Sequence, residues 1–127
     1  MNLFDNTLRD GGNVVGHGFS EELTKSIIGG LLNAGIKDIE MGNCKGLGAY
    51  GKLGAQKCPS DETYFEILQP YLPQGRIGMF MLAKCADKEN IRKAKEAGLN
   101  FLRVGANASD GQGAVKAVEM VKEAGLI

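Results

Sequence analysis

The residues with the clearest chemical potential are an arginine and an aspartate, Arg9 and Asp10, which stand side by side near the start of the chain. The apolar run around them predicts a short buried strand. Its members are Leu3, Phe4 and Leu8. Adjacent residues of a strand point to opposite faces, so both side chains reach one ligand only where the strand breaks, and Gly11 and Gly12 are expected to supply that break. An anion-binding guanidinium beside a hard oxygen donor suits a metal-bound keto acid.

The elements that must position these residues follow a repeated strand–helix rhythm. Three segments end alike, with an alanine and a glycine before an apolar residue, at residues 34–36, 97–99 and 124–126. Each glycine stands where a helix is expected to stop, in the left-handed conformation that glycine adopts without steric cost. Helices are therefore predicted over residues 20–34, from Ser60, from near Asp87 and from about Gln112.

The predicted helices carry capping residues and apolar faces. Ser20 and Ser60 are plausible caps, and acidic residues follow each of them, as suits the positive end of a helix dipole. The residues expected to face the core are Leu23, Ile27, Ile28, Leu31 and Leu32 in the first helix, Tyr64, Ile67, Leu68 and Tyr71 in the second, Ile91 and Ala94 in the third, and Val115, Val118 and Val121 in the fourth.

Short strand candidates separate these helices, at residues 36–41, 76–82 and 99–104. With the opening strand they give four βα units, the pattern of a parallel sheet covered by helices. Four such units make half of a TIM barrel, which usually needs ~250 residues. We therefore predict an α/β fold in which residues 1–127 form a single domain, the N-terminal half of a TIM barrel, with residues 125–127 as the start of a fifth strand. A self-contained four-stranded α/β sheet is the alternative.

The composition is that of a soluble globular protein, with 43% hydrophobic and 24% charged residues. The formal net charge is zero, so nothing favours nucleic acid or an acidic membrane surface as a partner. No apolar run is long enough for a membrane span, and no basic region precedes an apolar core at the N-terminus. Three cysteines without C-x-x-C spacing predict free thiols and a cytoplasmic location. The one histidine, His17, excludes a histidine-rich metal site made by this chain alone.

Two motifs give the chain a family resemblance. The D-x-T-L-R-D-G string of residues 5–11, followed by G-x-x-x-I-E at residues 35–40, resembles the opening of the DRE-TIM metallolyases. That group includes 4-hydroxy-2-oxovalerate aldolase, hydroxymethylglutaryl-CoA lyase and the isopropylmalate-synthase-like condensing enzymes. Its Asp, Arg and Glu match Asp10, Arg9 and Glu40. The similarity runs through all 127 residues, and residues 40–54 are most similar to the ketoacid aldolases.

The resemblance implies a mechanism. A divalent ion, Mg²⁺ or Mn²⁺, would be held by Asp10 and by two histidines of a later His-x-His, and it would chelate a pyruvate-like substrate. Cleavage of a carbon–carbon bond leaves an enolate, and Arg9 with the metal would stabilise the developing oxyanion. Glu40 would act from behind, by orienting Arg9 or a metal-bound water.

Two departures from the family pattern bear on this mechanism. The later His-x-His is absent from these residues, so this chain alone is expected to bind metal weakly and to be inactive. The ketoacid aldolases carry a general-base histidine three positions after the metal aspartate, where this chain has Asn13, which cannot take up a proton at neutral pH. His17 would replace that histidine only if the loop folds back.

Further candidates follow the other predicted strands. Asn43 comes after the second strand and is expected either to contact substrate or to shape the turn, and Asn107 after the fourth strand is a candidate substrate contact. Arg103 lies within the fourth strand and would reach the barrel mouth or form an ion pair. The long loop at residues 44–59 is expected to be a lid, a substrate-recognition segment or an oligomer contact.

The leading hypothesis is a metal-dependent carbon–carbon lyase of the pyruvate-aldolase type, which cleaves a 4-hydroxy-2-keto acid into a keto acid and an aldehyde. One alternative is a Claisen-type enzyme that condenses an acyl-CoA with a 2-keto acid. A second alternative is a catalytically inactive half-barrel that serves as a binding or assembly module. Exposed edges of a four-stranded sheet promote pairing with another copy, so a homo-oligomer is expected.

Overall fold

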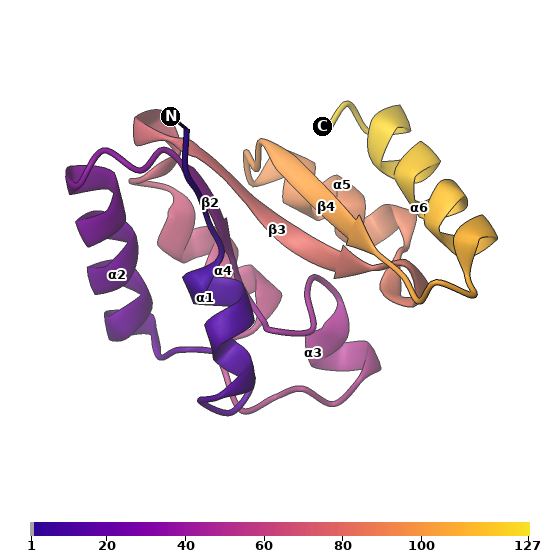
Figure 1. Ribbon diagram of the computed structural model, residues 1–127, viewed down its shortest axis with the longest axis horizontal. Helices are drawn as coiled ribbons and strands as arrows, with labels where there is room; N and C mark the ends of the chain where they lie inside the picture. The colour runs from indigo at the N-terminus through magenta and orange to yellow at the C-terminus, as the bar shows by residue number, and fades with distance from the viewer. Residues whose placement is uncertain (1) are drawn as a thin grey trace.

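The computed structural model describes residues 2–127, and its backbone contains a four-stranded parallel sheet with helices packed outside it (Figure 1). The strands are β1 (Phe4–Asp5), β2 (Asp38–Met41), β3 (Arg76–Leu82) and β4 (Phe101–Gly105), and they lie side by side in the order β1-β2-β3-β4. All three pairings are parallel. A sequential order without a switch point is typical of a TIM barrel and differs from a doubly wound sheet, so the predicted α/β class is confirmed.

Four helices complete the βα units, and all of them begin where the sequence predicts. They are α2 (Glu21–Asn33), α4 (Asp61–Leu68), α5 (Lys88–Glu96) and α6 (Gly111–Glu123). Side-chain oxygens of Ser20, Ser60, Asp87 and Asp110 accept hydrogen bonds from backbone amides of the first turns. Three helices end before glycines with positive φ, as expected, at Gly35, Gly98 and Gly125. Within residues 2–127, no helix is long and apolar enough to cross a lipid bilayer.

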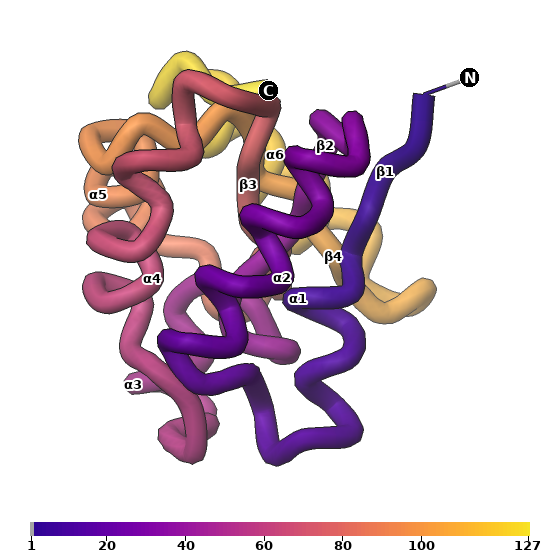
Figure 2. The backbone as a smooth tube through the Cα atoms, turned by 90° about the vertical axis from the view of Figure 1, so that its left-hand side faces the viewer, coloured from indigo at the N-terminus to yellow at the C-terminus, as the bar shows by residue number. Residues whose placement is uncertain are grey.

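Shorter elements lie in the connections. They are α1 (Thr7–Asp10), α3 (Ala49–Lys52) and the 3-10 turns Gly11–Asn13, Leu72–Gln74 and Ala83–Cys85. Figure 2 shows α4 and α5 on one side of β3, with β1 at the opposite edge of the molecule. Residues 125–127 do not form a strand, although the amide of Leu102 in β4 donates to the carbonyl oxygen of Ile127 at 3.1 Å.

The core lies between the sheet and the helices and takes alternate residues from each strand. Its strand members include Ile39, Met41, Ile77, Met79, Met81 and Leu102, and its helix members include Ile28, Leu32, Tyr64, Leu68, Ile91, Ala117 and Val121. Successive strand residues point to opposite faces, so the residues between these core positions face the inner side of the sheet. The alternation therefore places Glu40, Phe80 and Arg103 together on the inner face.

Two helices use a different face from the predicted one. In α2, Leu23 is 46% exposed, and Thr24 is buried in its place. In α6, Val115 and Val118 are exposed by 58% and 39%, and the buried positions are Ala117 and Val121. Residues four apart lie on one helix face, so the small side chain of Ala117, rather than the larger valines, shares a face with Val121.

The opening strand is shorter and more exposed than predicted. Leu3 and Phe4 are 54% and 47% exposed, and the buried Leu8 belongs to α1. The chain turns because a helical turn starts at Thr7, whose amide donates to a carboxylate oxygen of Asp5 at 3.0 Å. The expectation that Gly11 and Gly12 break the strand was wrong: helical turns span residues 7–13, and neither glycine has a positive φ.

Candidate functional site

The centre of the candidate site is Glu40, a fully buried carboxylate on the inner face of β2. One of its oxygens, Oε1, accepts hydrogen bonds from Nε of Arg9 and Nη2 of Arg103, each at 2.8 Å. The other, Oε2, accepts from Nε of Arg103 at 2.7 Å. Two guanidinium groups therefore share one carboxylate, and this pairing offsets the cost of burying the charge. Hydrogen bonding to Glu40 raises the pKa of Arg103 above its usual value.

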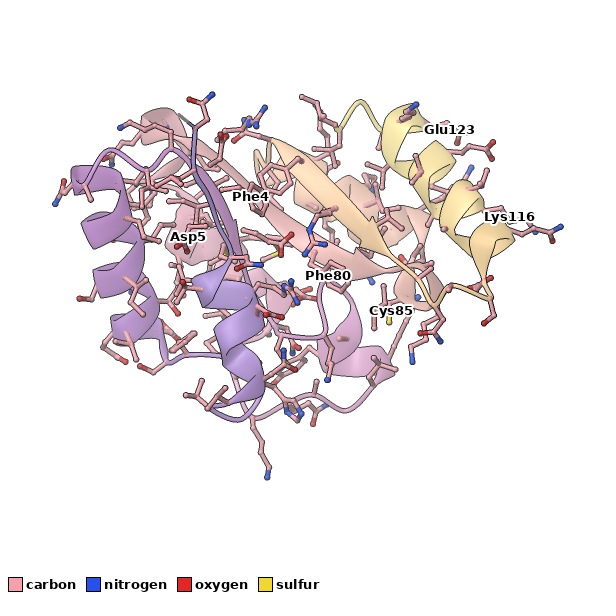
Figure 3. The ribbon with its side chains drawn as sticks, viewed as in Figure 1. Phe4, Asp5, Phe80, Cys85, Lys116 and Glu123 are labelled. Carbon is pink, nitrogen blue, oxygen red and sulfur yellow. The ribbon has the colours of Figure 1, made fainter. Side chains whose placement is uncertain are left out.

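An aromatic ring lies against both cations. The centroid of the Phe80 ring is 4.7 Å from Cζ of Arg9 and 4.8 Å from Cζ of Arg103, within the range of cation–π attraction (Figure 3). The ring has room because β4 carries a glycine beside it, since a Cβ at Gly105 would overlap the Phe80 ring. We call Glu40, Arg9, Arg103 and Phe80 the Glu40 cluster.

Asp10 stands beside the Glu40 cluster, with its side chain 59% exposed. Its Oδ1 accepts from Nη1 of Arg9 at 2.8 Å and from the side-chain amide of Asn13 at 3.4 Å. Arg9 is thus held by two of its nitrogens between two carboxylates. In the part of the chain that the structure describes, its third nitrogen, Nη2, has no hydrogen-bond partner. That group can donate to an anionic ligand.

The sequence-predicted trio of Arg9, Asp10 and Glu40 is therefore brought together, while its role in chemistry stays a prediction. A metal site is not complete here. Among residues 2–127, no three His, Cys, Asp or Glu side chains lie close enough to hold an ion. Asp10 alone offers one exposed carboxylate, so the described residues do not fit a metal by themselves.

The loop after α1 folds back on itself. This is the condition under which His17 could replace the missing general-base histidine. The amide of His17 donates to the carbonyl oxygen of Gly12 at 2.8 Å, and its own carbonyl accepts from the amide of Cys44 at 2.7 Å. His17 has a positive φ of 81°. Its Nδ1 is buried and lacks a hydrogen-bond partner among the described residues. The structure thus fixes the backbone of His17 against the loop after β2.

Asn13 cannot serve as the base, and the structure gives it another task. Its side-chain amide donates to the backbone oxygen of Asp10 at 2.9 Å, and its Oδ1 accepts from Nζ of Lys45 at 3.2 Å. Asn13 therefore links the carboxylate of Asp10 to a lysine of the next βα loop.

Of the two roles predicted for Asn43, the structure shows the shaping of the turn. The side chain is buried, and its amide donates to the carbonyl oxygen of Ala55 at 2.8 Å and to Sγ of Cys58 at 3.2 Å. Its Oδ1 accepts from the amide of Lys45 at 2.9 Å. These bonds engage the side chain inside the loop, so it does not present a polar atom to a substrate.

The long loop at residues 44–59 covers the carboxyl end of β3. The amide of Leu47 donates to the carbonyl oxygen of Phe80 at 2.8 Å, and the amide of Gly48 donates to Oδ2 of Asp61 at 2.8 Å. Burial raises the pKa of Asp61 from its usual value to about 6. The loop is therefore bonded both to the sheet and to the first turn of α4.

Asn107 is exposed and lies at a cavity of about 360 Å³ next to these elements. The polar side chains that line this cavity are His17, Lys45, Lys84, Asn107 and Asp110. Neither the two lysines nor Phe80 was singled out from the sequence. The alternation of β3 could have placed Phe80 on the inner face, because it stands between the core residues Met79 and Met81.

Comparison with known proteins finds 4-hydroxy-2-oxovalerate aldolases among the relatives of this chain. No family model matches the chain. A 4-hydroxy-2-oxovalerate aldolase of Carboxydothermus hydrogenoformans is 27% identical over 99% of this chain and 38% of its own length. Two further proteins of that name share 29% and 30% identity over 99% of this chain, from Paraburkholderia xenovorans and Nocardia farcinica, and the matches cover 36% of each. The chain thus spans little more than a third of the relatives that it matches.

These relatives are named as aldolases, which are lyases, and the similarity extends over nearly the whole of this chain. Together with the Arg9-Asp10 pair, Glu40 and the sequential parallel sheet, this similarity supports the resemblance of the chain to the N-terminal part of the DRE-TIM metallolyases.

Proposed function

We propose that this chain supplies part of the active site of a lyase that cleaves a 4-hydroxy-2-keto acid into a pyruvate-type enolate and an aldehyde. The names of the relatives support this reaction class. The observation that carries the proposal is the fixed position of Arg9, which is bonded to Glu40 through Nε and to Asp10 through Nη1. A cation whose orientation is set before the substrate arrives stabilises developing negative charge without reorganisation.

The reaction breaks the bond between C3 and C4 of the keto acid. The proton leaves the 4-hydroxyl group, C4 becomes the aldehyde carbon, and the electron pair passes to C3 and onward to the keto oxygen. Arg9 stabilises the negative charge on that oxygen through Nη2. Glu40 and Phe80 hold the guanidinium in place from behind. His17, the one imidazole of the chain, is the candidate acceptor for the proton.

We further propose that a divalent cation, Mn²⁺ or Mg²⁺, takes part with Asp10 as one ligand. When bound, such an ion polarises the keto oxygen and adds several kcal/mol of charge stabilisation. The other ligands would come from outside residues 2–127, because no three His, Cys, Asp or Glu side chains among these residues lie close enough together to hold an ion. The 127-residue chain by itself is accordingly expected to be inactive.

Exchange of the pyruvate methyl protons with D₂O, followed by NMR, tests the proposal on the protein at its natural length. We expect exchange that requires Mn²⁺ or Mg²⁺ and that falls at least tenfold in Arg9→Ala. Arg92→Ala is the matched control, because Arg92 lies exposed on α5 and its ion pairs among residues 2–127 are with Glu89 and Glu96 of the same helix. No exchange in a folded, metal-loaded protein would overturn the proposal.

One observation favours a second candidate, a catalytically inactive binding module. Asn13 occupies the position of the family's base and is itself bonded to Asp10 and Lys45. A module of this kind would bind pyruvate without removing a proton from its methyl group. Line broadening of the pyruvate signal without exchange would therefore identify it. The aldolase predicts both binding and exchange.

A further inference from the structure

The cavity of about 360 Å³ lies where three βα loops meet, at the carboxyl ends of β3 and β4. Lys45 comes from the loop after β2, Lys84 from the turn after β3, and Asn107 from the loop after β4. His17 lines the cavity from the loop after α1. The volume falls within the range of small-molecule pockets, roughly 300–1,000 Å³.

The lining of the cavity carries an excess of positive charge. In the part of the chain that the structure describes, neither Lys45 nor Lys84 forms an ion pair. The one acidic side chain of the lining, Asp110, caps α6 and accepts from the amide of Gly113 at 3.1 Å. By contrast, Lys52 of the same long loop pairs with Asp87 at 2.6 Å. The two cavity lysines therefore remain available for an anion.

The side chain of Asn13 connects this cavity to the candidate active site, because it is bonded both to Lys45 and to Asp10. Nζ of Lys45 donates to Oδ1 of Asn13, and the amide of Asn13 donates to Asp10. A substrate whose keto acid end lies at Arg9 and Asp10 would therefore extend its other end toward Lys45 and Lys84. A short neutral aldehyde would leave both ammonium groups without a partner.

We propose that this cavity binds an anionic group, a carboxylate or a phosphate, carried by the aldehyde half of the substrate. The proposal rests on the proposed function. It restricts the class of substrate, because it assigns a negative charge to the part of the substrate that leaves as the aldehyde. Lys84 and Lys45 attract the anion, and the side-chain amide of Asn107 is a further donor at the cavity wall.

The aldol direction tests the proposal on the protein at its natural length, with pyruvate and three acceptors. These acceptors are succinic semialdehyde, glyceraldehyde 3-phosphate and neutral butanal. We expect kcat/KM for at least one anionic acceptor to exceed that for butanal tenfold or more, and the better of the two identifies the group as carboxylate or phosphate. Lys84→Gln should lower this preference about tenfold.

Lys116→Gln is the matched control, because Lys116 is exposed and points outward from α6, away from the sheet (Figure 3). That variant should keep the preference unchanged. A preference for butanal, or an anionic preference that Lys84→Gln leaves intact, would overturn the proposal.

A binding measurement separates this proposal from the proposed function. Succinate and inorganic phosphate are titrated into the ¹⁵N-labelled protein, and we expect amide shifts at Lys84 and Asn107 that disappear in Lys84→Gln. Pyruvate exchange without such shifts and without anionic preference overturns the cavity proposal and leaves the lyase in place. Shifts without pyruvate exchange support an anion site at the cavity and overturn the lyase.

Discussion

Glu40→Gln tests how the candidate site is held together. The variant keeps the size of a fully buried side chain but removes the charge that accepts three hydrogen bonds from Arg9 and Arg103. Loss of one partner of a buried pair costs about 3–5 kcal/mol. The side chain of Arg103 is 45% exposed and regains water, and the glutamine oxygen still accepts one bond, so the lower end of that range applies. We expect the free energy of unfolding to fall by about 3 kcal/mol.

Urea denaturation followed by far-ultraviolet circular dichroism measures this loss, provided that the slope with urea stays the same. Glu89→Gln is the matched control, because Glu89 forms an exposed ion pair with Arg92 on the surface of α5. The loss in that control should be much smaller, because exposed ion pairs contribute little to stability. A loss below about 1 kcal/mol for Glu40→Gln, with an unchanged slope, would refute the view that this carboxylate anchors both arginines.

Three further variants test the long loop. Asn43→Ala should lower the free energy of unfolding by about 2 kcal/mol, because it leaves the carbonyl oxygen of Ala55 with only a weak donor, Sγ of Cys58 at 3.5 Å. Gly46→Ala should cost at least as much, because φ is 89° and the added Cβ would lie 2.5 Å from the carbonyl oxygen of Phe80. Burial raises the pKa of Asp61 from 3.8 to about 6, so the folded chain holds a proton that the unfolded chain releases between these values. The free energy of unfolding should therefore fall by about 2 kcal/mol as pH rises from 4 to 7, and Asp61→Asn should remove this part of the pH dependence.

Thermal and urea unfolding at fixed pH check the first two variants, and urea unfolding at a series of pH values checks the third. Asn33→Ala and Gly51→Ala are the controls, since Asn33 is exposed and a Cβ at Gly51 meets no atom within 4 Å. Equal stability of Gly46→Ala and Gly51→Ala would contradict the close approach at Phe80. A pH dependence that survives in Asp61→Asn would assign it to another group.

The sequence predicts well where local chemistry decides the structure. Ser20, Ser60 and Asp87 cap helices because a side-chain oxygen and the backbone amides that it satisfies lie within one turn. The helix faces were harder to predict. Thr24 is buried and Leu23 is exposed because the packing partner, rather than hydrophobicity, decides which side of α2 faces the sheet.

In the candidate site, too, some residues could be predicted from the sequence and others could not. The motif placed Arg9, Asp10 and Glu40 near one another, and the structure shows their contacts. The joint role of Phe80 and Arg103 depends on the register of β3 against β4, which sets these two residues directly opposite each other. Register is a tertiary property and cannot be deduced from the pattern of either strand alone.

The Glu40 cluster also has a consequence for the order of events in folding. It joins residue 9 to residue 103 through one carboxylate, so it can form only after all four strands have come together. Contacts of such long sequence separation are costly to close and tend to form late. Interactions that form after the folding transition state affect mainly the unfolding rate. Glu40→Gln should therefore speed unfolding in stopped-flow measurements and leave the refolding rate nearly unchanged.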